Sequence, residues 1–116
     1  MESQEDMKKG GTLAPAMAHR LERLLDYVEG SVVSRTLVKN DGGTVTLFSF
    51  DAGQELSEHT APFDAMVQVL DGEVELTIGG ETVNAGSGET VIMPANVPHA
   101  INAVGRFKML LTMIRG

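Results

Sequence analysis

From residue 31 to the carboxyl end, apolar and polar residues alternate within short segments that glycine, proline, asparagine and aspartate separate. Segment 73–78 shows this most clearly, because Val74, Leu76 and Ile78 alternate with polar residues. When side chains alternate with a period of two, one set lies on a buried face and the other set lies in solvent. The pattern predicts about eight antiparallel strands. The clearest of them are 31–38, 44–50, 65–70, 73–78, 90–93 and 107–114.

Before these segments, the apolar residues recur with a different period. Between Pro15 and Gly30 they are spaced by four, three, one and three positions, which is typical of one apolar stripe on a helix. Proline suits a first helical turn and glycine commonly follows the last one. The sequence therefore predicts one short amino-terminal helix, with a stripe formed by Met17, Leu21, Leu24, Leu25 and Val28.

Many short strands with one helix at the start predict an all-β sandwich or barrel and exclude a βαβ fold. A chain of 116 residues with 42% hydrophobic residues and a mean hydropathy of zero suits one packed domain. We expect a flexible leader over 1–12 and a single domain over 13–116. A jelly-roll barrel fits best, because its closure leaves few strand edges and its interior can hold one small ligand.

Composition and charge narrow the possible functions. The chain has no cysteine, which excludes disulfides and thiolate metal ligands. Its formal net charge of −7 disfavours nucleic acid and anionic membranes as partners. No apolar run is long enough to span a membrane, and the first ten residues are polar, so we expect a cytoplasmic location. A small molecule is the expected partner.

Two blocks of residues carry a family resemblance. Gly53, His59 and the segment 69–72 (Val-Leu-Asp-Gly) form one block, and Gly88, Pro94, His99 and Asn102 form the other. At about 53–72 and 88–102, these blocks resemble the two short motifs of the cupin superfamily. The resemblance implies a cupin jelly-roll barrel with a degenerate metal motif. Metal-binding cupins supply four ligands, in the order histidine, histidine, glutamate and histidine. His59 and His99 match the first and the last of these ligands, whereas Ala61 and Ala65 occupy the positions of the second and third. Asn96 also replaces the usual glycine of the second motif.

The two remaining histidines leave several alternatives. They can face each other as a hydrogen-bonded pair in a metal-free pocket, because buried polar groups need partners. They can instead hold one divalent transition metal ion together with water or a third ligand, for which Asp64 is the nearest candidate if Pro62-Phe63 turns it inward. One or both can also lie at the rim of the barrel in solvent.

Other polar and sulfur-containing residues are expected to have structural roles. Isolated basic residues such as Arg106 and Lys108 are usually solvated, although they could bind an anion. The methionines on predicted strands either fill the core or line an adaptable pocket, and core is the default. These methionines are Met66, Met93, Met109 and Met113.

Together these features predict a cupin-type domain that binds a small molecule in its barrel as a sensor or accessory protein. The alternative is a mononuclear metal-dependent enzyme, similar to cupin dioxygenases or isomerases, with His59 and His99 as ligands. We also expect a homodimer, because cupins commonly pair through strand faces and closed two-fold symmetry is the commonest oligomeric arrangement.

Overall fold

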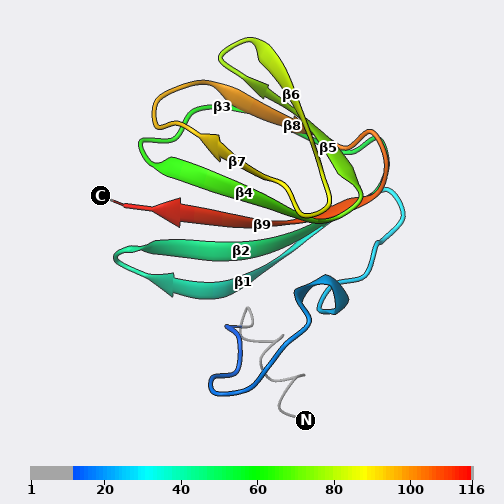
Figure 1. Ribbon diagram of the computed structural model, residues 1–116, viewed down its shortest axis with the longest axis vertical. Coiled ribbons are helices and arrows are strands. Elements are labelled where there is room, and N and C mark those ends of the chain that lie inside the picture. The colour runs from blue at the N-terminus through cyan, green and yellow to red at the C-terminus, as the bar shows by residue number, and fades with distance from the viewer. Residues whose placement is uncertain (1–11, 116) are drawn as a thin grey trace.

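The computed structural model describes residues 12–115 and contains nine strands in two sheets (Figure 1). The five-stranded sheet A has the order β1-β2-β9-β4-β7, and the four-stranded sheet B has the order β3-β8-β5-β6. Every recorded strand pairing is antiparallel. The strands are β1 (Val32–Asn40), β2 (Gly43–Phe50), β3 (Glu55–His59), β4 (Asp64–Asp71), β5 (Glu73–Ile78), β6 (Glu81–Gly86), β7 (Thr90–Met93), β8 (His99–Asn102) and β9 (Phe107–Ile114).

The structure confirms the all-β jelly-roll fold. The two sheets face each other across a core of apolar side chains, because alternate residues of each strand point between the sheets. Phe50 stacks on Phe107 at a ring-centroid distance of 4.6 Å, and Met93 and Met109 are fully buried beside the aliphatic residues. Met113 packs against this cluster, whereas Met66 lies on the outer face of sheet A.

The predicted amino-terminal helix is much shorter in the structure. Only a three-residue 3-10 helix, η1 (Leu21–Arg23), forms within an otherwise irregular arm over residues 12–30. Leu21, Leu24 and Leu25 of the expected stripe are half-buried, but Met17 and Val28 are exposed. Without burial along the whole stripe, a short helix lacks the tertiary packing that stabilises most helices. Apart from Thr12, the expected leader lies outside the described residues.

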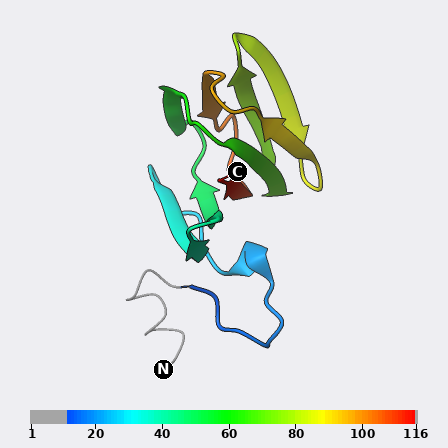
Figure 2. The same ribbon diagram turned by 90° about the vertical axis from the view of Figure 1, so that its left-hand side faces the viewer.

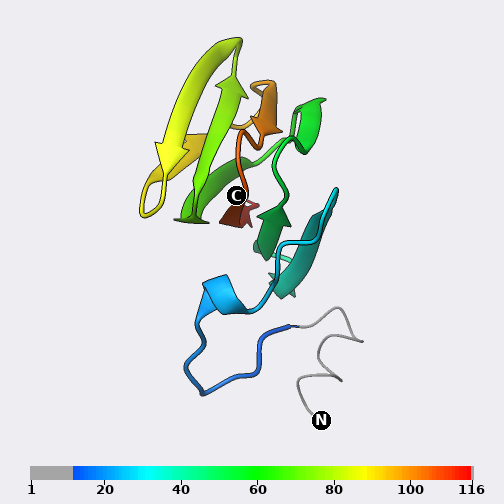
Figure 3. The same ribbon diagram turned by 90° about the vertical axis from the view of Figure 1, so that its right-hand side faces the viewer.

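The arm packs on the outer face of sheet A, on the side away from sheet B (Figures 2 and 3). The Ser49 hydroxyl donates to the Asp26 carbonyl over 3.0 Å, and the Lys108 ammonium donates to the Glu22 carbonyl over 2.5 Å. The Lys108 ammonium also lies 4.8 Å from the centroid of the Tyr27 ring. Lys108 is therefore only 8% exposed, and the expectation that it is solvated is wrong.

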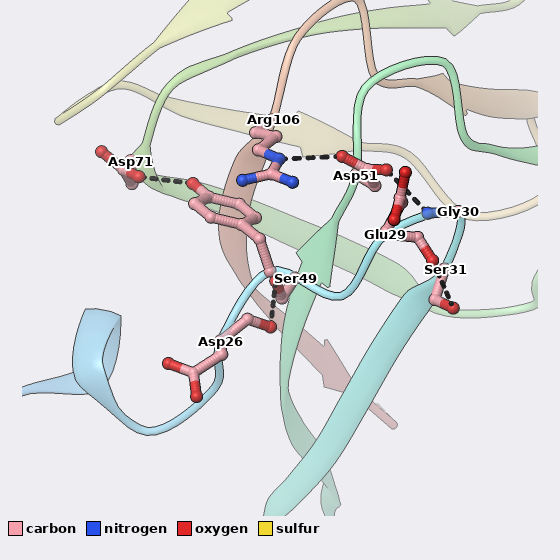
Figure 4. Close-up of polar contacts among 9 residues, drawn as sticks. Asp26, Glu29, Gly30, Ser31, Ser49, Asp51, Asp71 and Arg106 are labelled. Atoms are coloured by element: carbon pink, nitrogen blue, oxygen red, sulfur yellow. Dashed lines mark hydrogen bonds and ion pairs between the residues drawn. The ribbon is translucent and has the colours of Figure 1, made fainter.

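A polar network holds the end of the arm (Figure 4). The Tyr27 hydroxyl donates to the Asp71 carboxylate, and the Gly30 amide donates to Asp51 over 2.7 Å. Arg106 forms an ion pair with Asp51 at 2.8 Å. Burial and the adjacent Asp71 carboxylate raise the pKa of Tyr27, so this phenol remains a hydrogen-bond donor throughout the physiological range.

Candidate functional site

His59 and His99 lie directly opposite each other in sheet B. His59 is the last residue of β3 and His99 is the first residue of β8, and the two are cross-strand neighbours. Between the pairs Leu56–Ile101 and His59–His99, three steps along β3 match two steps along β8. This extra residue is a β-bulge, which lets His59 share a face with Leu56 although the two are three positions apart. The bulge thus brings the two imidazoles together.

The two imidazoles meet through their Nε2 atoms. The Nε2–Nε2 distance is 3.1 Å, the ring centroids are 4.4 Å apart, and the ring planes make an angle of 72°. His99 is only 3% exposed, whereas His59 is exposed to solvent. The pair therefore spans the boundary between the barrel interior and the surface, where an incoming molecule can reach it.

Backbone carbonyl groups determine which ring nitrogens have hydrogens. His59 Nδ1 lies 2.8 Å from the Ser57 carbonyl oxygen, and His99 Nδ1 lies 3.3 Å from the Val97 carbonyl oxygen. A carbonyl oxygen only accepts, so each Nδ1 must be the donor and each neutral ring presents a lone pair at Nε2. Two lone pairs facing each other at 3.1 Å need an added proton, a cation or a donor group from a ligand.

Burial lowers the pKa of His99, and the neighbouring His59 lowers it further, while the Val97 carbonyl partly opposes both effects. Desolvation acts in this direction because it disfavours the charged imidazolium. The lowered pKa favours the neutral form of His99, whose Nε2 can accept a hydrogen bond. The site presents at least one buried, oriented acceptor.

Short backbone bonds hold the loops around the pair. The Asn96 amide donates to the Ala61 carbonyl over 2.8 Å, and the Gly79 amide donates to the Pro98 carbonyl over 2.8 Å. Asn96 has a φ of 65°, a left-handed conformation that asparagine tolerates better than most residues. This explains how asparagine can occupy the position where the resemblance leads one to expect glycine.

The structure does not bring Asp64 to the histidines. Its carboxylate accepts a hydrogen bond from the Ala95 amide over 2.8 Å, and it borders a groove lined by Met66 and Ile92 of the outer face of sheet A. Among residues 12–115, no three histidine, cysteine or acidic side chains form a group that could hold a metal ion.

The positions that a metal-binding cupin would fill with histidine and glutamate are apolar here. Ala65 is buried between the sheets, and Ala61 lies half-buried in the β3–β4 connection. Two imidazoles alone do not fit a resident metal held by protein side chains, since such sites use three or four protein ligands.

Sequence reasoning identified both histidines but missed the groups that orient them. The Ser57 and Val97 acceptors are main-chain carbonyls, so no residue type indicates them. The signal that could have been used is the spacing: each carbonyl lies two residues before its histidine. The two contacts are local, from Ser57 in β3 and from Val97 in the loop before β8, and each fixes the tautomer of its own ring.

Comparisons with known proteins agree with this architecture. A family model described as a cupin domain matches residues 46–115, which include both histidines. A curated protein named pyrimidine/purine nucleoside phosphorylase, from Geobacter sulfurreducens, is 36% identical over 72 residues, covering 60% of this chain and 67% of that protein.

Solved structures are similar over most of the chain. A conserved protein of unknown function from Streptococcus pyogenes has a TM-score of 0.87 and 39% identity, covering 91% of this chain and 93% of its own. A cupin superfamily protein from Desulfitobacterium hafniense has a TM-score of 0.81 and 28% identity, covering 90% of this chain and 95% of its own.

Proposed function

Because this chain belongs to the cupin domain family, whose fold encloses a barrel interior, we propose that it binds a small organic molecule at the His59–His99 pair. The observation that supports this proposal is the convergence of the two Nε2 atoms at 3.1 Å while both Nδ1 atoms donate to backbone carbonyls. The pair is pre-oriented to accept hydrogen bonds, and preorganisation lowers the entropic cost of binding.

The chemistry of the pair favours a ligand with hydroxyl or amino groups. Such a group donates to the His99 Nε2 and removes the repulsion between the two lone pairs. Ile78, which is partly buried and packs against the core, lies directly beside His99 in the sheet. It suits the apolar part of the same ligand.

Nucleosides are the ligand class that we propose. A nucleoside has ribose hydroxyl groups, which can donate hydrogen bonds to the imidazole pair. It also has a flat base whose faces have low polarity, which suits the apolar side chain beside the pair. The relative named pyrimidine/purine nucleoside phosphorylase independently supports this class. A protein that binds a nucleoside without turnover would act as a sensor or accessory protein.

The competing function is a mononuclear metal-dependent enzyme. The specific observation in its favour is that both imidazoles are tethered at Nδ1, which is how metal-ligating histidines are commonly oriented. His59 and His99 would then hold one divalent transition metal, which supplies Lewis-acid chemistry, while substrate or water completes the ligand set.

The test measures binding of adenosine, guanosine, uridine and cytidine to untagged protein by calorimetry, with and without inorganic phosphate. We expect at least one nucleoside to bind, and His59→Ala and His99→Ala to weaken it by about tenfold each, as expected when a hydrogen bond worth about 1.4 kcal/mol is lost. His19→Ala is the matched control, because the His19 imidazole bonds the Ala14 carbonyl within the arm.

Chromatography of the same mixtures distinguishes binding from catalysis. Release of free base that requires phosphate would extend the proposal to phosphorolysis, whereas binding without release supports a sensor or accessory role. No binding of any nucleoside, or equal binding by all three histidine variants, would contradict the proposed site.

A further inference from the structure

The inner face of the β1–β2 hairpin carries hydroxyl groups where the neighbouring strands carry apolar side chains. Phe48 and Phe50 of β2 point between the sheets, so the residues of β2 at even positions share that face. The strand register places Ser34 beside Phe48 and Thr36 beside Thr46, so the same face continues onto β1. Four residues, which we call the hydroxyl wall, therefore belong to this face: Ser34, Thr36, Thr44 and Thr46.

The interior of the barrel is open to solvent along the hydroxyl wall. The register continues the row of Thr46 into Leu111 of β9 and Val67 of β4, so the same inner face becomes apolar beyond β2. Val67 is fully buried, whereas the three threonines of the wall are half-buried and Ser34 is exposed. The wall is therefore the part of this face that a molecule from solvent can reach.

Sheet B borders the hairpin through its edge strand β3. At the opposite edge of sheet B, two backbone hydrogen bonds join the connection between β6 and β7 to β4. The Val69 amide donates to the Glu89 carbonyl and the Gly88 amide donates to the Val69 carbonyl, each over 2.9 Å. These bonds close the barrel on the β6–β7 side, whereas β3 directly follows β2 and lies on the side of the hairpin.

The direction of β3 brings His59 to the level of the wall. β3 runs opposite to β2 and ends on the same side of the molecule as the turn between β1 and β2 (Figure 1). His59 lies four residues from the start of β3 and Thr46 lies four residues from the end of β2, about 13 Å in each strand at about 3.3 Å per residue. Because facing sheets keep their strands within about 30° of each other, the two residues lie at a similar level.

The fold leaves the hydroxyls of the wall available to a ligand. Within the part of the chain that the structure describes, no hydrogen bond joins these four side chains to other protein groups, and no buried side-chain polar atom lacks a partner. The hydroxyls therefore face accessible space, where each can donate one hydrogen bond and accept others. Thr36 and Thr46 are direct cross-strand partners, which places their Cβ atoms about 4.5–5.5 Å apart. This spacing suits two neighbouring hydroxyl groups of one ligand.

We propose that the hydroxyl wall binds the 2′ and 3′ hydroxyl groups of a ribose, so that the site distinguishes ribonucleosides from nucleosides that lack these groups. The inference rests on the proposed function, because it assigns the sugar of the nucleoside to the hairpin side of the opening. The remaining donor groups of the nucleoside are then free to bond the His59–His99 pair.

Calorimetry on the untagged full chain tests this assignment with adenosine, guanosine, uridine and cytidine, each compared with its 2′,3′-dideoxy counterpart. The base is the same within each pair of ligands, so the comparison isolates the two hydroxyl groups. We expect the ribonucleoside to bind at least about tenfold more tightly than its dideoxy counterpart, as expected for two hydrogen bonds.

Threonine variants identify the groups that make these bonds. Thr36→Val and Thr46→Val remove one hydroxyl each, keep a β-branched side chain, and should each weaken the ribonucleoside about fivefold while leaving the dideoxynucleoside unchanged. Thr46→Ser retains the hydroxyl and should keep most of the affinity. Thr82→Val is the matched control, because Thr82 is exposed on β6 of sheet B and should change neither affinity. Thermal melts will show that the variants fold.

The outcomes separate this inference from the proposed function. If ribonucleosides bind and the His59→Ala and His99→Ala variants weaken them, but Thr36→Val and Thr46→Val do not, the hydroxyl wall is overturned and the proposed function stands. Equal weakening of the ribonucleoside and its dideoxy counterpart in the threonine variants would also overturn the wall, because a general structural effect would explain it. Absence of binding by every nucleoside would overturn both.

Discussion

Leu47 provides a quantitative test of how the arm packs. It lies on β2 between Thr46 and Phe48, and its side chain points to the outer face of sheet A, away from the main core. It is nevertheless 0% exposed. Ser49, two residues along on the same face, bonds the arm at Asp26. The burial of Leu47 therefore depends on the docked arm.

The expected cost of Leu47→Ala follows from that burial. Truncating a fully buried leucine costs about 2–5 kcal/mol, because transfer free energy is lost and a cavity is left behind. If the arm did not cover this face, Leu47 would be partly solvated and the same change would cost about 1 kcal/mol or less. We expect a loss of about 3 kcal/mol, within the usual 5–15 kcal/mol total stability.

Urea denaturation followed by circular dichroism measures this loss. With an m-value of about 1.5 kcal/mol per molar urea, a loss of 3 kcal/mol lowers the midpoint by about 2 M. Val104→Ala is the control, because Val104 is 68% exposed and should change the midpoint little. Equal, small shifts in both variants would refute the docked position of the arm.

Three further outcomes are expected. Because the pKa of His99 is lowered in the folded protein, the unfolded chain takes up a proton first as pH falls below about 6.5. Urea titrations from pH 8 to pH 5 should therefore show the stability of the wild type falling relative to that of His99→Asn. A constant difference in stability between the two proteins would contradict the lowered pKa. Because Asn96 has a positive φ, thermal denaturation should show that Asn96→Gly keeps the stability of the wild type, whereas Asn96→Ala lowers it by about 1 kcal/mol. Equal losses of stability in the two variants would argue against that backbone conformation. Gly72→Ala should prevent or severely impair folding, because at a φ of 78° the added Cβ would lie 2.2 Å from the Arg106 carbonyl oxygen. A soluble variant with an unchanged melting temperature would contradict this close approach of the two backbone segments.

Much of the sheet structure could be predicted because each strand carries its own local signal. Alternation placed β5 at its observed bounds, and short apolar runs between turn residues placed β7 and β9 at theirs. The Asn-Asp-Gly-Gly sequence marked the turn between β1 and β2. The face that each residue occupies follows from the same period of two.

The arm could not be predicted in this way because distant residues hold it. Its contacts include Ser49, Asp71 and Lys108, which lie on three different strands. The spacing of its leucines is compatible with a helix, but packing on a sheet overrides a weak helical preference. For the same reason the burial of Lys108 has no local sequence signal.

The histidine site was partly predictable. The motif spacing singled out His59 and His99, and the structure shows that they form a contacting pair. The bulge in β3 and the carbonyl acceptors that orient the rings depend on backbone geometry rather than on residue type. The position of Asp64 also depended on the direction of a loop, which its sequence neighbours Pro62 and Phe63 left open.

The most direct test of whether the His59–His99 pair is a metal-free ligand site is the metal content of the protein. It is measured by elemental mass spectrometry on untagged protein that has been purified without chelators. We expect far less than one transition metal ion per chain, in the wild type and equally in the His59→Ala, His99→Ala and His19→Ala variants, even after incubation with divalent metals and desalting. Near-stoichiometric metal that is lost in the His59 and His99 variants but retained in the His19 variant would contradict it and establish the metalloenzyme alternative as the one to pursue.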